Sequence, residues 1–147
     1  MKSKWKSNIL VFVQFGMILL MTLPFGTPTV YLEAGMVFVV LGLGVGVAAL
    51  GKNKIGSFNV RPDIREDCDL VKDGVYAYVR HPMYASVIVT MFGIMLIYFG
   101  KLEAVAYAIL VLNMLMKMFY EESLWHCHSD EYLEYSKNTS RLIPRVF

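Results

Sequence analysis

Residues 74–84 read GVYAYVRHPMY, and this stretch stands where a charged segment meets an apolar one. A second polar pair, Glu121 and Glu122, follows a later apolar run. Ionisable groups at the edge of apolar segments are costly in a membrane, and they are kept there mostly for a function. The apolar runs beside the two clusters therefore predict the fold, and the clusters are the candidates for a functional site.

The composition indicates a membrane protein, because 56% of the 147 residues are hydrophobic, more than an ordinary soluble domain contains. A spanning helix needs about 20 apolar residues, and four runs approach or reach this length: residues 9–25, 30–50, 84–99 and 104–120. We therefore expect one all-α domain over residues 1–147, a polytopic membrane protein with four transmembrane helices.

Short turns at residues 26–29 and 100–103 predict that these helices form two hairpins. A C-terminal interfacial helix over residues 120–137 is expected to cap the bundle. Gly42 and Gly46 have the small-xxx-small spacing that allows two helix backbones to approach closely. A dinucleotide-binding loop is the alternative for these glycines, but no strand precedes them and they lie inside an apolar run.

Two polar residues inside the apolar runs also carry predictions. Gln14 is expected to form a hydrogen bond between helices. Lys117 lies near one end of its run, and we expect its side chain to extend to the membrane interface.

The distribution of charge predicts the topology. Of the 14 Lys and Arg, only Lys101 falls in the two short turns. The positive-inside rule then places both termini and the long middle segment in the cytoplasm. The net charge of +2 is too small to suggest a nucleic-acid partner. Cys68 and Cys127 both fall on the reducing side, so we expect no structural disulfide.

A metal site is not expected. His126, Cys127 and His128, together with Cys68, offer the ligand atoms that zinc prefers. However, a spacing of two residues directs the histidines to different faces of a helix.

The two polar clusters suit the binding of a charged ligand. Pro82 favours the first turn of a helix, which places Arg80 and His81 beside a helix N-terminus, where anions bind well. An interfacial anchor is the alternative for these two residues. Glu121 and Glu122 are expected at the end of a helix, where they need a cationic partner such as Arg80 or Arg141, or a ligand's ammonium or hydroxyl groups. A hairpin of the last two spanning helices would bring both clusters together in one cytoplasmic pocket.

In combination these motifs resemble the isoprenylcysteine carboxyl methyltransferase family, and the phospholipid N-methyltransferases look similar. The resemblance extends from residue 50 to residue 144 and is carried by the following segments: Phe58-Asn59-Val60-Arg61-Pro62, the 74–84 stretch with its Arg-His-Pro-x-Tyr core, Glu121-Glu122, Tyr132-x-x-Tyr135 and Arg141-Leu142-Ile143-Pro144. It implies an integral-membrane enzyme that uses S-adenosylmethionine.

The resemblance also implies the site residues. The residues expected to bind the cofactor are Tyr76, His81, Pro82, Tyr84, Glu121, Glu122, Arg141 and Pro144. Arg80 and Glu122 are the residues expected to act in catalysis, and the tail with Arg141 is expected to fold over the cofactor.

The expected reaction is methyl transfer to a lipophilic acceptor, with the carboxylate of an isoprenylcysteine compound as the first choice. A phospholipid or other lipid amine, and a hydroxyl or thiol of a hydrophobic metabolite, stay open as acceptors. The non-enzymatic alternative is a small membrane scaffold or transporter-like bundle, but a transporter places its ionisable residues near mid-membrane. Membrane lipid is an expected partner, and a homodimer that completes the substrate cleft is a further alternative.

Overall fold

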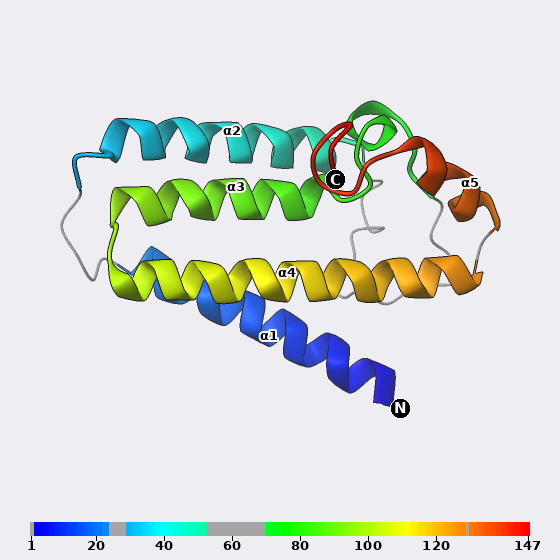
Figure 1. Cartoon of the computed structure of the whole chain (residues 1–147), viewed down its shortest axis with the longest axis horizontal. Helices are drawn as coiled ribbons and strands as arrows, with labels where there is room; N and C mark the ends of the chain where they lie inside the picture. The colour runs from blue at the N-terminus through cyan, green and yellow to red at the C-terminus, as the bar shows by residue number, and fades with distance from the viewer. Residues whose placement is uncertain (1, 24–28, 53–69, 129) are drawn as a thin grey trace.

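The computed structural model describes residues 2–23, 29–52, 70–128 and 130–147. Over these residues the chain is helical and forms no extended strand, which confirms the all-α prediction (Figure 1). The elements are α1 (Lys2–Thr22), α2 (Leu32–Leu50), the short 3-10 helix η1 (Gly74–Ala77), α3 (Pro82–Ile97), α4 (Lys101–His128) and α5 (Asp130–Asn138).

Three of the described helices, α1, α2 and α4, are long and apolar enough to cross a membrane. The fourth apolar helix, α3, has only 16 residues. The expected number of four spanning helices is therefore not confirmed: three described helices have the full length, and α3 is a shorter apolar helix beside them.

The C-terminal helices are divided differently from the prediction. α4 continues past Tyr120 to His128, and a separate short helix, α5, follows it. Glu121 and Glu122 consequently lie inside α4 rather than at a helix end, so the expected conflict with a helix C-terminus does not arise. The helix continues because its residues beyond Glu122 still have a surface to pack on: the ring of Trp125 stacks on Tyr132 of α5, with centroids 5.6 Å apart.

The glycines of α2 form a close contact with α3, as the small-residue spacing predicts. A Cβ atom added to Gly46 would lie 2.6 Å from Ser86 Oγ, and one added to Gly35 would lie 2.7 Å from the carbonyl oxygen of Gly93. Ser86 donates a hydrogen bond of 2.7 Å to the carbonyl oxygen of Gly42. We call this contact the α2–α3 seam; it consists of Gly35, Gly42, Gly46, Ser86, Thr90 and Gly93.

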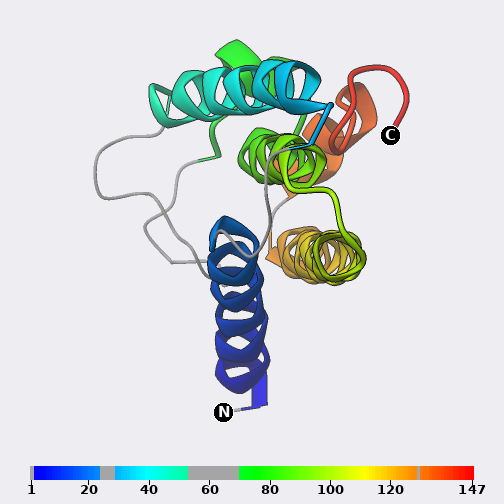
Figure 2. The same cartoon turned by 90° about the vertical axis from the view of Figure 1, so that its left-hand side faces the viewer.

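The expected hairpin of the first two helices is not seen, because α1 packs mainly on α4 (Figures 1 and 2). Side-chain hydrogen bonds join this pair. Lys117 Nζ donates to Gln14 Oε1 over 2.7 Å, and Asn113 donates to the carbonyl oxygen of Leu10 over 3.0 Å. The prediction for Gln14 is thus confirmed. The prediction for Lys117 is wrong, because its side chain is only 1% exposed and turns inward to this partner instead of extending to the interface.

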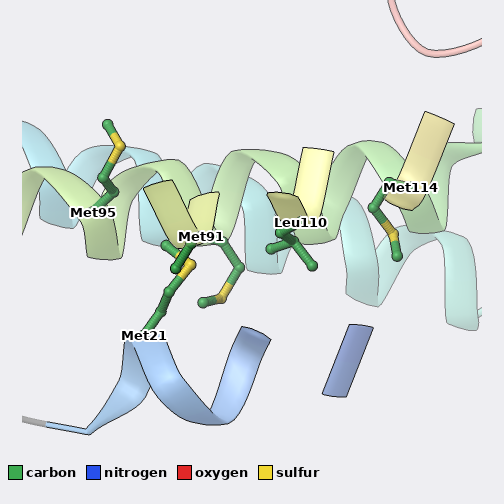
Figure 3. Packing of buried hydrophobic residues seen from close by; sticks show 6 residues of the cluster. Met21, Met91, Met95, Leu110 and Met114 are labelled. Carbon is green, nitrogen blue, oxygen red and sulfur yellow. The ribbon is translucent and has the colours of Figure 1, made fainter. Parts of the chain in front are cut away.

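An apolar core rich in methionine joins α1, α3 and α4 (Figure 3). Its buried members are Met21, Met91, Met95, Ala106, Leu110 and Met114. Methionine fills irregular spaces between helices well, because its side chain is unbranched and flexible. This core occupies the part of α3 that follows its first turns, and it leaves the N-terminal end of α3 to the polar groups.

Candidate active site

The C-terminal tail is tied to the segment that precedes α3. Val79 and Ser140 form a parallel bridge. The backbone N–H of Arg80 donates to the carbonyl oxygen of Ser140 over 2.8 Å, and the backbone N–H of His81 donates to the carbonyl oxygen of Arg141 over 3.0 Å. The tail therefore ends beside the N-terminus of α3 (Figure 1), although some sixty residues separate the two segments along the chain.

Three side chains meet at the carboxylate of Glu122, whose own side chain is 5% exposed. Its Oε1 accepts from Arg80 Nε at 3.0 Å and lies 3.4 Å from His81 Nε2, and its Oε2 accepts from Arg141 Nε at 2.9 Å. We call these four residues the Glu122 cluster. It confirms the expected convergence of the two polar motifs, since α3 and α4 bring His81 and Glu122 within reach of one small molecule.

The guanidinium of Arg80 also holds the end of α5. Its Nη1 donates to the carbonyl oxygen of Ser136 over 2.8 Å and to that of Thr139. The Arg80 side chain is 7% exposed. A buried guanidinium requires both charge compensation and hydrogen bonds. Here Glu122 supplies the negative charge, and the carbonyl oxygens at the C-terminal end of α5 accept the further hydrogen bonds.

Glu121 has a different partner from Glu122. The hydroxyl of Tyr84 donates to Glu121 Oε2 over 2.6 Å. The Tyr84 ring is stacked on that of His81, with centroids 5.3 Å apart and planes 4° from parallel. The stacked pair links the two glutamates, because one ring contacts each carboxylate.

Arg141 is the least buried charged member of the cluster, with its side chain 36% exposed. Its guanidinium lies over the rings of Phe119 and Phe147, at 5.3 and 5.5 Å from their centroids. Its two Nη atoms make no hydrogen bond to the described residues. Arg141 can therefore offer donors to a ligand without giving up its bond to Glu122.

The remaining predicted residues, Tyr76, Pro82 and Pro144, are not members of the Glu122 cluster. Pro82 is buried at the first position of α3. The carbonyl oxygen of Tyr76 accepts a 2.6 Å hydrogen bond from the hydroxyl of Tyr135, and burial raises the pKa of Tyr135 to about 12. Pro144 is exposed in the C-terminal turn and is not joined to the Glu122 cluster. The segment 58–62 and Cys68 lie outside the described residues.

The structure adds residues that the sequence patterns did not indicate. Phe119 and Phe147 contact Arg141, and Lys117 lies with its Nζ 5.2 Å from the centroid of the Tyr84 ring. A charged residue inside an apolar run was the available signal for Lys117, but the run alone does not say which way its side chain turns.

Taken together, guanidinium groups, carboxylates and a stacked aromatic pair meet at one end of two apolar helices. Such a set can bind a zwitterionic ligand that carries a ring, while the apolar helices can hold a lipophilic one.

Comparison with known proteins gives a match to a family model. No curated protein and no solved structure matches the chain. Residues 30–125 match the family model described as "Isoprenylcysteine carboxyl methyltransferase (ICMT) family". This match covers α2, α3 and most of α4, including Arg80, His81, Tyr84 and both glutamates, and it ends before α5 and the tail. Because it extends over more than half of the 147 residues, the chain belongs to the isoprenylcysteine carboxyl methyltransferase family, a family of membrane methyltransferases.

Proposed function

We propose that this protein uses S-adenosylmethionine to methylate the carboxylate of a lipophilic acceptor of the isoprenylcysteine type. The observation that supports this proposal most directly is the Glu122 cluster. It gathers two guanidinium groups, an imidazole and a carboxylate between the tail and the first turn of α3.

The residues present fit the chemistry of this cofactor. Its methionine part has an ammonium and a carboxylate, and its nucleoside part has a purine and two hydroxyls. Arg141 has donors available for the carboxylate, and Glu121 and Glu122 are acceptors for the ammonium or the hydroxyls. The parallel rings of His81 and Tyr84 provide an aromatic surface for the purine or for the positive sulfonium.

The tail is suited to cover the bound cofactor. It is held by backbone hydrogen bonds to residues 78–81 and by the ion pair between Arg141 and Glu122. A cofactor ammonium that binds Glu122 Oε2 would compete with Arg141, so binding and the position of the tail are coupled in this proposal. Pro144 would contact the cofactor only through a movement of the tail.

When bound, S-adenosylmethionine would supply an electrophilic methyl group for transfer to the acceptor oxygen, with its neutral thioether as the leaving group. An acceptor carboxylate is already ionised, so no residue has to remove a proton. The protein's contribution is to align the two reactants and to replace their hydration with fixed charges and dipoles. Arg80 is suited to this role because Glu122, Ser136 and Thr139 hold its guanidinium in place.

The proposal includes an arrangement in the membrane. α3 would cross as the fourth span despite its 16 residues, since a bilayer thins around a short hydrophobic segment. The Glu122 cluster and both termini would face the cytoplasm, where the cofactor is dissolved, as the placement of Lys and Arg indicates. The acceptor would enter from the lipid side.

The experiment that tests the proposal is a calorimetric titration of the purified protein in detergent with S-adenosylmethionine, followed by a methyl-transfer assay. N-acetyl-S-farnesylcysteine and vesicles of phosphatidylethanolamine serve as acceptors in separate reactions. We expect binding of the cofactor and methylation of the first acceptor. Methylation of phosphatidylethanolamine alone would instead support the lipid-amine alternative, and absence of cofactor binding would support the non-catalytic bundle.

His81→Ala is the variant that localises the site, because it removes the ring that joins Glu122 to Tyr84. We expect it to abolish cofactor binding while the helical circular dichroism signal is kept. His126→Ala is the matched control: His126 is exposed and contacts the edge of Tyr132. Equal binding by both variants would place the cofactor elsewhere.

A further inference from the structure

Lys117 carries a buried charge that the proposed function does not yet use. Its side chain is 1% exposed, and it lies in α4, a helix apolar and long enough to cross a membrane. An ammonium in such a position is costly, and a compensating partner is expected.

The two groups that Lys117 contacts directly among the described residues are uncharged. Its Nζ donates to Gln14 Oε1 over 2.7 Å and lies 5.2 Å from the centroid of the Tyr84 ring. Glu121 is one helical turn further along α4, and its charge attracts the ammonium without direct contact, because its carboxylate accepts the hydroxyl of Tyr84. Lys117 therefore forms no ion pair with the described part of the chain.

The position of Lys117 relates it to the candidate active site. Its ammonium contacts the Tyr84 ring, which is stacked on His81, and His81 in turn contacts Glu122. On its other side, one turn before it in α4, Met114 belongs to the apolar core. Lys117 thus lies at the boundary between the polar cluster and the core, where the head group of a lipophilic acceptor would meet the cofactor site.

We propose that Lys117 binds the carboxylate of the methyl acceptor and selects anionic head groups over amines. This inference rests on the proposed function and narrows it to methylation at oxygen. A carboxylate beside the ammonium would supply a counter-charge in direct contact, whereas a protonated lipid amine would add a second positive charge to the same buried place. The Tyr84 ring then stabilises the charge of the ammonium from another direction.

The test compares the binding of N-acetyl-S-farnesylcysteine with that of its carboxamide to the full-length protein in detergent, without cofactor. The two probes differ in the charge of the head group. We expect the unaltered protein to prefer the carboxylate by about 10- to 100-fold, the range for a hydrogen bond between charged groups. Lys117→Met keeps the length of the side chain and removes its charge, and the ratio should fall to near one. Lys117→Arg should keep the preference.

Gln14→Leu is the matched control, because it removes the same hydrogen bond between α1 and α4 but leaves the ammonium. It should keep the preference for the carboxylate. An equal loss in Gln14→Leu and Lys117→Met, or a preference that survives in Lys117→Met, would show that Lys117 only joins two helices and would overturn the inference. If Lys117→Met does not fold, Lys117→Gln provides the uncharged comparison.

The same experiment separates this inference from the proposed function. Unaltered protein that binds no S-adenosylmethionine contradicts the proposed function, yet the carboxylate-to-carboxamide ratio still measures the role of Lys117. Protein that binds the cofactor but both probes equally overturns the inference alone.

Discussion

The α2–α3 seam and the Glu122 cluster are both buried, but they are built by different physical means. The seam brings two helix backbones together by omitting side chains at Gly35, Gly42 and Gly46, and its members lie on two regular helices. The cluster brings together charged side chains from the segment before α3, from α4 and from the tail. The seam should therefore be sensitive to added volume, and the cluster to lost charge.

The largest effect is expected from Glu122→Gln, which keeps the volume of the side chain but removes its charge. Arg80 would remain buried without a carboxylate partner, and breaking a buried ion pair in this way costs about 3–5 kcal/mol. We expect a clear decrease in the thermal unfolding temperature in detergent and the loss of cofactor binding.

Glu121→Gln is the neighbouring control for that prediction. Glu121 accepts a hydrogen bond from Tyr84 and belongs to no ion pair among the residues described, so its substitution should destabilise the protein less. Equal decreases in unfolding temperature for the two variants would mean that the charge of the Glu122 cluster has no special importance for stability.

A medium effect is expected from Gly42→Ala in the seam. The added Cβ would lie 2.6 Å from the backbone nitrogen of Thr90 and 2.9 Å from the carbonyl oxygen of Ser86, so α2 and α3 must move apart. Overpacking of this kind costs about 1–3 kcal/mol. Gly44→Ala is the control, because nothing lies within 4 Å of its Cβ position; it should be neutral or slightly stabilising. Thermal unfolding measures the difference in unfolding temperature between the two variants. Equal unfolding temperatures would show that the seam is loosely packed.

The smallest effect is expected from Tyr135→Phe, which removes the 2.6 Å hydrogen bond to the carbonyl oxygen of Tyr76. The loss should be about 1 kcal/mol. Burial raises the pKa of Tyr135 from 10.0 to about 12, so ionisation above pH 10 favours the unfolded chain. The native tyrosine should therefore lose its stabilising contribution as the pH rises from 10 towards 12, and the phenylalanine variant should lack this step. Urea unfolding of both proteins at pH 8 and pH 11 tests this prediction. An equal change in the free energy of unfolding in the two proteins would show that Tyr135 does not cause the pH dependence.

Much of the fold could be predicted from residue patterns that act locally. Apolar runs gave the positions of α1, α2 and α3, and the spacing of Gly42 and Gly46 indicated a close helix contact. The pairing of α1 with α4 could not be predicted, because it depends on Gln14 and Lys117 meeting across about a hundred residues of chain. A short turn between two helices suggested a hairpin, but a polar contact inside the bundle decides the partner.

The candidate site was predictable in its membership more than in its bonds. The sequence motifs indicated Arg80, His81, Tyr84 and the two glutamates, and the structure brings them together. The motifs could not indicate which glutamate has which partner. Adjacent residues on a helix point in different directions, and the surrounding packing decides what each of them contacts. As a result Glu122 faces the cations and Glu121 faces Tyr84.

The sequence by itself determined that this chain is helical, membrane-embedded and a member of a methyltransferase family, because length, hydrophobicity and short motifs are local properties. Only the tertiary structure decided which partner each buried charge has. The inward turn of Lys117 and the return of Arg141 to Glu122 both depend on side chains from distant segments sharing a buried space, where each charge takes the partner that the packing leaves within reach.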